Sequence, residues 1–227
     1  MSAAKPAEAE TSQPREPLAE RAFNVLEDLI VFQDLRPGSM LSEAALMERT
    51  GLGRTPIREA LQRLALEHMV EIHPYRGSFV VPISAEAQLK SLEVRRPVEE
   101  LAVGLAAERA TPEQRESMRA VIAALDAFRS DDPREFGPLL SQAHHLVAMA
   151  AHNEFLSSVM ASLHGPSRRF WFASMKDKAR ELGVAAQLHS EILTSVLNGE
   201  SENAQAASLR LNRYLVDFTY ATLNQGR

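Results

Sequence analysis

The chain of 227 residues contains no cysteine. Without thiols it can form no disulfide bonds and offers no thiolate ligands to a metal. It also has no apolar run near 18 residues, and no basic segment followed by an apolar one at its start. Those are the marks of a membrane span and of an export signal. We therefore expect a cytoplasmic protein with no membrane partner.

Motifs of common enzymes are absent as well. The sequence has no HExxH motif, no ExxH pair and no recognisable arrangement around a nucleophile, so hydrolytic or oxygen chemistry has little support. A helical metalloenzyme would have to use the scattered residues His144, His145, His152 and His189. We expect no enzymatic activity.

A short helical pattern with two different faces is present after Gly53. Its apolar side chains have the spacing of a helix packed on a core, at Ile57, Ala60, Leu61 and Leu64. The opposite face carries side chains that donate hydrogen bonds to phosphates or base edges, namely Arg54, Thr55, Arg58 and Gln62. Thr55 is the expected N-cap and Pro56 the first helical residue, which directs the positive end of the helix dipole outward. The pattern predicts a helix that reads DNA.

Segments on either side predict a winged helix-turn-helix. Residues 41–49 favour a short helix, and residues 50–53 a tight turn before the reading helix. An amphipathic helix is expected over residues 18–35, and strand-like runs at 69–73 and 78–81 predict a hairpin. Arg76 and Gly77 would lie at the tip of this wing, close to a phosphate or a minor groove.

This stretch resembles the GntR family of bacterial transcription regulators over about residues 18–82. The matching motifs are Pro37-Gly38, Leu41-Ser42-Glu43, the run from Arg54 to Leu61, Leu64, and Arg76-Gly77-Ser78-Phe79-Val80. The resemblance implies that Arg54, Thr55 and Arg58 contact DNA and that Gly77 approaches the groove. Ala44 stands where some relatives carry a base-reading arginine, so their operator sequence does not transfer. Glu59 is expected to hold a neighbouring arginine or a helix end, because phosphate repels a carboxylate.

Charge is distributed unevenly along the chain. The net charge is −5, yet residues 35–80 contain six arginines and five glutamates. A weakly charged reading head implies low nonspecific affinity, so dimerisation and a few arginines would supply specific binding.

Composition and periodicity divide the chain into three parts. Residues 1–16, without apolar periodicity, are expected to form a disordered tail. Residues 17–82 form the winged head, and residues 84–227 an all-helical domain. Helices are expected in the latter at 84–110, 111–129, 135–151, 154–174, 185–197 and 202–223, with a capping box at Thr111-Pro112-Glu113-Gln114. The predicted fold is mainly α, an N-terminal winged helix-turn-helix followed by an all-α helical bundle.

The helical part resembles the FCD effector domain of FadR-type GntR regulators. The matching motifs are the run from Leu92 to Glu100, His144 with Asn153, and His189 with Ile192-Leu193. The resemblance implies a dimerising bundle around a ligand cavity, in which Arg95 holds the carboxylate of a small organic acid. It also implies that one aspartate and three histidines often hold a divalent metal. His144 and His189 match two of those ligands. Leu140 stands at the position of the aspartate, and Leu211 or Asn212 at the position of the last histidine.

Three interpretations of His144 and His189 stay open. They are ligands of Zn, Ni or Mn, completed by Asn212, water or the effector, although such sites normally need three or four protein ligands. Alternatively they are neutral hydrogen-bond donors to an effector in a metal-free pocket. In the third interpretation they are ordinary buried histidines. The neighbouring His145 is expected at the surface.

Arg95 has two interpretations, a salt bridge to Glu99 or a bidentate contact with an effector carboxylate. The family pattern favours Arg95 over Arg96 for the effector. Further along, Arg168 and Phe172 would share one helix face and line the cavity. For the segment 168–172, however, we favour an aromatic core with solvated arginines.

These features predict a homodimeric, ligand-responsive transcription regulator, by family default a repressor. Its two heads would bind a near-palindromic operator in double-stranded DNA. A carboxylate-type effector held by Arg95, His144, His189 and Asn212 would bias the dimer between two head spacings. The main rival is an effector-independent DNA-binding protein whose helical part only dimerises.

Overall fold

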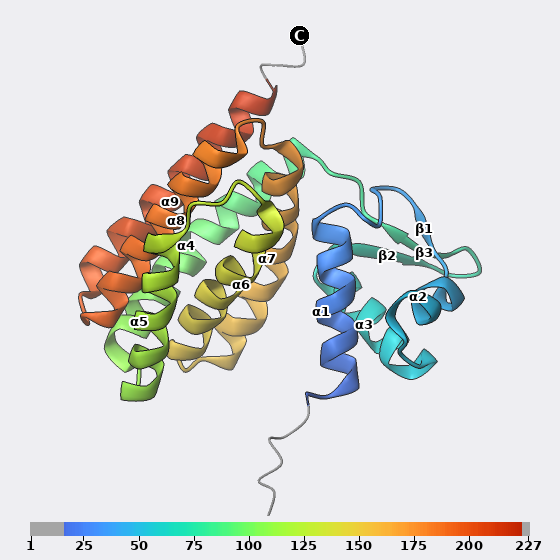
Figure 1. Cartoon of the computed structure of the whole chain (residues 1–227), viewed down its shortest axis with the longest axis horizontal. Coiled ribbons are helices and arrows are strands. Elements are labelled where there is room, and N and C mark those ends of the chain that lie inside the picture. The colour runs from blue at the N-terminus through green and yellow to red at the C-terminus, as the bar shows by residue number, and fades with distance from the viewer. Residues whose placement is uncertain (1–15, 224–227) are drawn as a thin grey trace, which may run out of the picture.

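The computed structural model describes residues 16–223, and Figure 1 shows a small part and a helical part side by side. The expected tail over residues 1–16 lies outside the described residues apart from Glu16. The elements follow in the order α1 (Leu18–Val31), β1 (Met40–Leu41), α2 (Glu43–Thr50), α3 (Arg54–Leu66), β2 (Val70–His73), β3 (Gly77–Val80), α4 (Ala85–Arg109), α5 (Pro112–Ala127), α6 (Pro133–Ala150), α7 (Glu154–Ser174), α8 (Lys178–Leu197) and α9 (Ser201–Leu223).

The small part, called the head below, runs from α1 to β3. Its antiparallel sheet has the strand order β1-β3-β2, with Val70 opposite Val80 and Met40 opposite Phe79. The buried faces of its helices meet in one core, which includes Phe23, Leu26, Ile30, Leu46, Ile57, Leu61, Leu64 and Met69. The expected winged helix-turn-helix is confirmed. Strand β1 was not predicted, because two residues are too few to show an alternating pattern.

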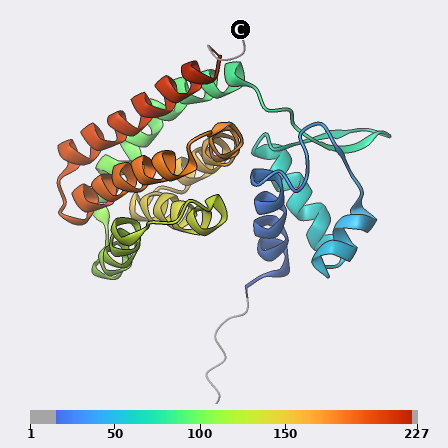
Figure 2. The same cartoon turned by 45° about the horizontal axis from the view of Figure 1, so that its top comes forward.

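The helical part, called the bundle below, contains α4 to α9. Figure 2 shows α4 and α9 running side by side along one edge, with α5 against α8 on the other side. Their buried faces form a second core, which includes Leu92, Met118, Leu125, Phe136, Leu140, Trp171, Leu182, Leu193 and Leu211. The mainly helical fold class is therefore confirmed. Within residues 16–223, no helix is long and apolar enough to cross a membrane.

Capping side chains decide where the bundle helices begin. Thr111 forms the expected capping box, in which the Gln114 N–H donates to its Oγ1 at 3.2 Å and its own N–H donates to Gln114 Oε1 at 2.9 Å. Two other helices begin earlier than expected, α6 at Pro133 and α8 at Lys178. Asp132 and Asp177 are the caps there, and each accepts a backbone N–H of the first turn.

The first helix of the head ends earlier than expected, at Val31 rather than at residue 35. Gln33 takes a left-handed backbone with φ of 62°, which turns the chain out of the helix.

The head packs against the bundle through α1 and the turn that follows it. The ring of Phe32 lies 5.3 Å from that of Phe172 on α7. On α6, Arg134 donates to Asp34 at 2.8 Å. A Cβ added at Gly137 of α6 would lie 2.7 Å from Cζ of Phe32, so glycine is what allows this close approach.

Candidate DNA-reading surface and effector cavity

The reading helix α3 presents its polar face to solvent. Ile57, Ala60, Leu61 and Leu64 are buried as expected, whereas the side chains expected to contact DNA are exposed, namely Arg54, Thr55, Arg58 and Gln62. The N-cap differs from the expectation. Gly53, not Thr55, occupies that position, so Arg54 and Thr55 belong to the first helical turn. Both residues therefore lie where backbone N–H groups and the dipole attract an anion.

Glu43 at the start of α2 holds the arginines of the reading helix. Nε of Arg58 donates to both carboxylate oxygens of Glu43, at 2.8 and 3.0 Å, and Nε of Arg54 lies 3.9 Å from the same group. Ser42 caps α2 and so fixes the position of Glu43 in its first turn. Glu59 was expected to hold a neighbouring arginine or a helix end; the carboxylate that pairs with Arg58 is Glu43, which lies far from it in sequence.

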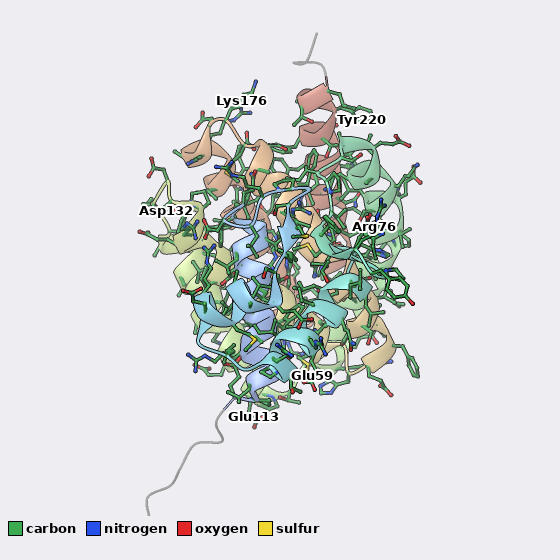
Figure 3. The ribbon with its side chains drawn as sticks, turned by 90° about the vertical axis from the view of Figure 1, so that its right-hand side faces the viewer. Glu59, Arg76, Glu113, Asp132, Lys176 and Tyr220 are labelled. Carbon is green, nitrogen blue, oxygen red and sulfur yellow. The ribbon has the colours of Figure 1, made fainter. Side chains whose placement is uncertain are left out.

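The hairpin of β2 and β3 forms the wing. Its tip is exposed from His73 to Gly77, and Figure 3 shows Arg76 of this hairpin and Glu59 of α3 on the outer face of the head. Tyr75 has φ of 63° and Gly77 has φ of 95°, so both take left-handed backbone in the turn. Tyr75 is fully exposed, and the sequence analysis did not single it out. The sequence signal for this exposed side chain was an aromatic residue within a Pro-Tyr-Arg-Gly turn.

A cavity lies among helices of the bundle. It consists of two adjoining pockets with volumes of about 20 Å³ each, which share His144, His189 and Leu211 in their walls. Arg95, Ser167, Arg168 and Trp171 line one volume, and Glu99 and His164 the other. Each pocket has room for about one water molecule, so an organic ligand would enter only if the lining side chains move.

Arg95 is buried in this wall, whereas Arg96 is exposed. One terminal nitrogen of Arg95 lies 2.7 Å from Glu99 Oε1, and the other donates to Ser167 Oγ at 3.0 Å. Its Nε has no hydrogen-bond partner among the described residues. The salt bridge to Glu99 is therefore present, and one donor of the guanidinium is left over.

Three histidines meet at the cavity, one more than the sequence analysis expected. Nε2 of His144 lies 3.3 Å from Nε2 of His189, and the ring of His144 stacks on that of His164 with centroids 3.9 Å apart. His164 donates from Nε2 to Glu99 Oε1 at 2.8 Å. His164 was not expected from the sequence, because none of the matching family motifs includes it; it lies four residues before Arg168 on the same helix.

Asn212, expected in the effector and metal sites, is not among the residues that line the cavity. Its Nδ2 donates to the backbone carbonyl of Leu92 at 3.1 Å, so this amide links α9 to α4. The neighbouring Leu211 lines the cavity instead. Leu140, at the expected aspartate position, is buried and apolar.

Two protein-family models match this chain. Residues 18–80 match the model described as "Bacterial regulatory proteins, gntR family", and residues 90–213 match the FCD domain. The chain belongs to the GntR family of bacterial regulatory proteins and carries an FCD domain. It is therefore a transcriptional regulator and not an enzyme.

Curated relatives agree with this assignment, and a solved structure shares the fold. This GntR regulator is 29% identical over 180 residues to the Nta operon transcriptional regulator of Aminobacter aminovorans, covering 79% of this chain and 83% of the relative. It is also 29% identical over 200 residues to the HTH-type transcriptional regulator LutR of Bacillus subtilis, covering 78% and 89%. The structure of E. coli McbR/YncC shares the fold, with a TM-score of 0.69 at 19% identity, covering 92% of this chain and all of the other.

Burial keeps the histidines of this regulator neutral. It lowers the pKa of His189 to about 4 and that of His144 well below the usual value, and it lowers the pKa of His164 despite the hydrogen bond to Glu99. Burial alone would raise the pKa of Glu99, but Arg95 and His164 outweigh it and hold that pKa at about 2. At neutral pH the cavity therefore presents neutral imidazoles beside an ionised carboxylate.

The donor set fits a divalent metal, although only His144 and His189 match ligands of the family's set. Glu99, His144 and His164 each offer a ligand atom within 4.8 Å of the others. A tetrahedral ion with bonds of ~2.05 Å separates its nitrogen ligands by ~3.3 Å, and the Nε2 atoms of His144 and His189 are 3.3 Å apart. Nδ1 of His189 donates to the Ala185 carbonyl at 2.8 Å, which leaves its Nε2 lone pair facing His144.

Proposed function

We propose that this protein is a homodimeric, ligand-responsive regulator that binds a near-palindromic operator. In this proposal residues 17–82 bind DNA and residues 84–227 bind the effector and dimerise. Arg54, Thr55, Arg58 and Gln62 contact the major groove, and Arg76 and Gly77 of the wing contact the adjacent backbone or minor groove. All six residues are exposed, and Figure 3 shows Arg76 of the wing on the same side of the head as Glu59 of α3, which supports this role. A bacterial operator lies in the cytoplasm, where the regulator would act.

A small carboxylate is the proposed effector, held by Arg95 with His144 and His189. The observation that carries this is the free Nε of Arg95, a buried donor in a cavity wall. Leaving a buried donor unpaired costs free energy, about 1–3 kcal/mol, which a ligand oxygen would recover. Neutral His144 can add one N–H donor without adding charge, whereas the one proton of neutral His189 is on Nδ1 and donates to the Ala185 carbonyl.

A divalent cation of the Zn, Ni or Mn class belongs to the same proposal. His144 and His189 would hold it together with Glu99 and His164, in place of the aspartate and third histidine that the family uses. Arg95 neutralises Glu99, so an effector anion would otherwise add a net negative charge to a buried site. A bound cation supplies Lewis-acidic positive charge that compensates the anion.

Regulation follows if the effector binds two arrangements of the dimer with different affinities. Release of the operator by the effector would make the protein a repressor. A tenfold loss of operator affinity requires about 1.4 kcal/mol of coupling. The rival function, a dimer without an effector, is favoured by the Arg95–Glu99 pair, which satisfies most of the guanidinium without a ligand.

The single tryptophan provides the test, because buried Trp171 lines the cavity beside Arg95. Its fluorescence is titrated with acetate, lactate, succinate and citrate, first in a chelator and then with Zn²⁺, and operator binding is followed in parallel. The operator is a fragment selected from random DNA by the wild-type protein. We expect one acid to change both signals. Arg95→Lys should weaken the acid by at least about tenfold, because a lysine cannot make a bidentate contact but still compensates Glu99.

Arg96→Gln is the matched control, since Arg96 is the exposed neighbour of Arg95. It should bind the acid as the wild type does. If no acid changes the fluorescence with or without Zn²⁺ while the operator still binds, the effector-independent dimer is the correct function.

A further inference from the structure

Three consecutive residues of α7 connect the cavity to the head. Ser167 accepts hydrogen bonds from Arg95 and from Gln88, at 3.0 and 2.8 Å. Arg168 donates to Glu27 of α1 at 2.5 Å, and Arg169 donates to the backbone carbonyl of Val81, which leads from the wing to α4. One turn of α7 thus touches the effector arginine, the first head helix and the linker.

These arginines correct an expectation from the sequence. We expected them to be solvated, but Arg168 is 7% exposed and Arg169 is 3% exposed. Burial lowers the pKa of Arg169 to about 10. Surface arginines usually gain little from an ion pair, whereas removing one partner of a buried pair is costly. The contact between Arg168 and Glu27 therefore contributes to where the head lies.

Gly165 allows α1 to approach α7 this closely. A Cβ added at this glycine would lie 3.2 Å from Glu27 Oε1, tighter than an ordinary contact. Together with Gly137, which accommodates Phe32, it places a glycine on each of two bundle helices where the head docks. Both positions are consistent with a defined docked arrangement rather than a loose contact.

Arg168 also faces the ligand. It lines the same cavity volume as Arg95, His144 and His189. Its two terminal nitrogens donate to Glu27 and to Ser141, while its Nε has no partner among the described residues. A bidentate carboxylate engages Nε and one terminal nitrogen of a guanidinium together. An effector carboxylate that takes this pair of donors would compete with Glu27.

We propose that Arg168 is a second effector-binding residue. An anion bound in the cavity would replace Glu27 as its partner and so weaken the contact between the head and the bundle. The proposal rests on the proposed function, because it concerns the same cavity and the same class of ligand. In this proposal Arg168 pairs either with a carboxylate of the head or with a carboxylate of the ligand, and this exchange couples the cavity to the head.

Carboxylates around Glu27 would make the loosening effective. Burial and the nearby charge of Glu27 raise the pKa of Asp28 and of Glu67. Arg168 opposes the rise in pKa at both groups: at Asp28 it is the larger opposing charge, ahead of Arg134, and at Glu67 it adds to the larger effect of Arg63. When Arg168 pairs with a ligand, the head keeps the mutual repulsion of these carboxylates and loses an opposing charge.

The position of the head is measured by pulsed electron paramagnetic resonance. Because the chain has no cysteine, Glu48→Cys on α2 and Glu202→Cys on α9 are the only labelling sites, and both positions are exposed. Labelled chains are diluted with unlabelled ones so that distances within one chain dominate. The ligand probe is the acid that changes Trp171 fluorescence most strongly.

We expect one narrow distance distribution for the wild type and a broader or shifted one with the acid. Glu27→Gln and Arg168→Gln should show the shifted distribution without acid, and the acid should add no further change in Arg168→Gln. Arg168→Lys should keep the narrow distribution, since lysine still pairs with Glu27, but bind the acid at least fivefold more weakly. Arg134→Gln is the control, because the Arg134–Asp34 pair also joins head to bundle but Arg134 is 53% exposed.

The outcomes separate this proposal from the proposed function. If the acid binds and releases the operator while Glu27→Gln and Arg168→Gln keep the wild-type distances, the coupling proposal is overturned and the effector site stands. An acid-induced shift of full size in Arg168→Gln has the same meaning. If no acid binds, the effector site and the competition at Arg168 are both overturned.

Discussion

Buried and exposed guanidinium groups have different roles in this protein. Arg95, Arg168 and Arg169 are each held by a fixed partner inside the bundle or at its contact with the head. An unpaired buried charge is costly, so these partners can change only when another group replaces them. Arg58 is 59% exposed at its side chain and is paired with Glu43. Such a surface pair is weak enough to exchange for a phosphate or a base.

Arg58→Ala should weaken operator binding by at least about 1 kcal/mol, or about fivefold. The alanine removes a charge-assisted donor from the exposed face of the reading helix while the buried face stays intact. The measurement is fluorescence anisotropy on the selected operator at physiological salt. Arg119→Ala, an exposed arginine on α5, should bind as the wild type does. Equal affinity of Arg58→Ala and the wild type would show that α3 does not bind in the groove.

Acid should destabilise the metal-free protein through its histidines. The pKa of folded His189 is about 4, below the value of 6.5 for a free histidine. Between those values the unfolded chain binds more protons, so stability is fully present above pH 6.5 and is lost as pH falls toward 4. The loss is at most about 1.4 kcal/mol per pH unit for each such histidine.

This pH dependence is measured by urea unfolding in a chelator at several values between pH 7.5 and 4.5. His189→Gln removes one titrating group and should give a shallower decline than the wild type. Parallel declines in the two proteins would mean that His189 does not titrate on unfolding in this range.

At the scale of elements, nearby residues determine where a helix ends, whereas residues far apart in the chain determine which helices lie side by side. The capping box at Thr111 could be read from four adjacent residues, and it is present. The start of α8 at Lys178 was missed, because Asp177 caps it without a proline or a glutamine to complete the motif. The approach of α7 to α1 depends on Gly165 and Glu27, which are far apart in the chain. Local motifs can predict the first kind of feature but not the last.

Thr111→Ala should lower the free energy of unfolding by about 1 kcal/mol, since it leaves the backbone N–H of Gln114 without its acceptor. Urea denaturation monitored by circular dichroism gives the value. Ser117→Ala on the exposed side of the same helix should change stability by less than about 0.5 kcal/mol. Equal effects of the two substitutions would show that the cap does not stabilise α5.

At the scale of the whole molecule, the contact between the head and the bundle combines a buried ion pair with an aromatic contact. Arg168 and Glu27 meet beside the cavity, and Phe32 packs on Phe172 further along α7. In the proposed dimer two such heads face one operator. Any ligand that shifts this contact changes the distance between the heads, which is the quantity that two half-sites on DNA select.

A spacing test follows from that geometry. Inserting five base pairs between the half-sites turns one of them by about half a helical turn, so we expect operator affinity to fall at least about tenfold. Replacing five base pairs at the centre without changing the length is the control and should have a small effect. If the insertion leaves affinity unchanged, single heads bind independently and the dimer does not set the spacing.

The sequence by itself determined the winged head, the helical bundle and the exposed face of the reading helix. These follow from apolar periodicity and from turn and capping residues, which act over a few neighbouring positions. The buried stripe from Ile57 to Leu64 and the exposed Arg54 and Arg58 are of this kind. The motif resemblance at Arg95 and His144 likewise indicated where a cavity should be sought.

Only the tertiary structure decided how the polar groups pair. His164, absent from the sequence expectations, joins His144 through stacking and Glu99 through a hydrogen bond, whereas Asn212 turns away to the carbonyl of Leu92. Arg168 lies in the interior because α1 carries Glu27 to meet it. A charged side chain is buried or solvated according to whether a partner from a distant segment reaches it. The residue pattern along one helix does not show whether such a partner exists.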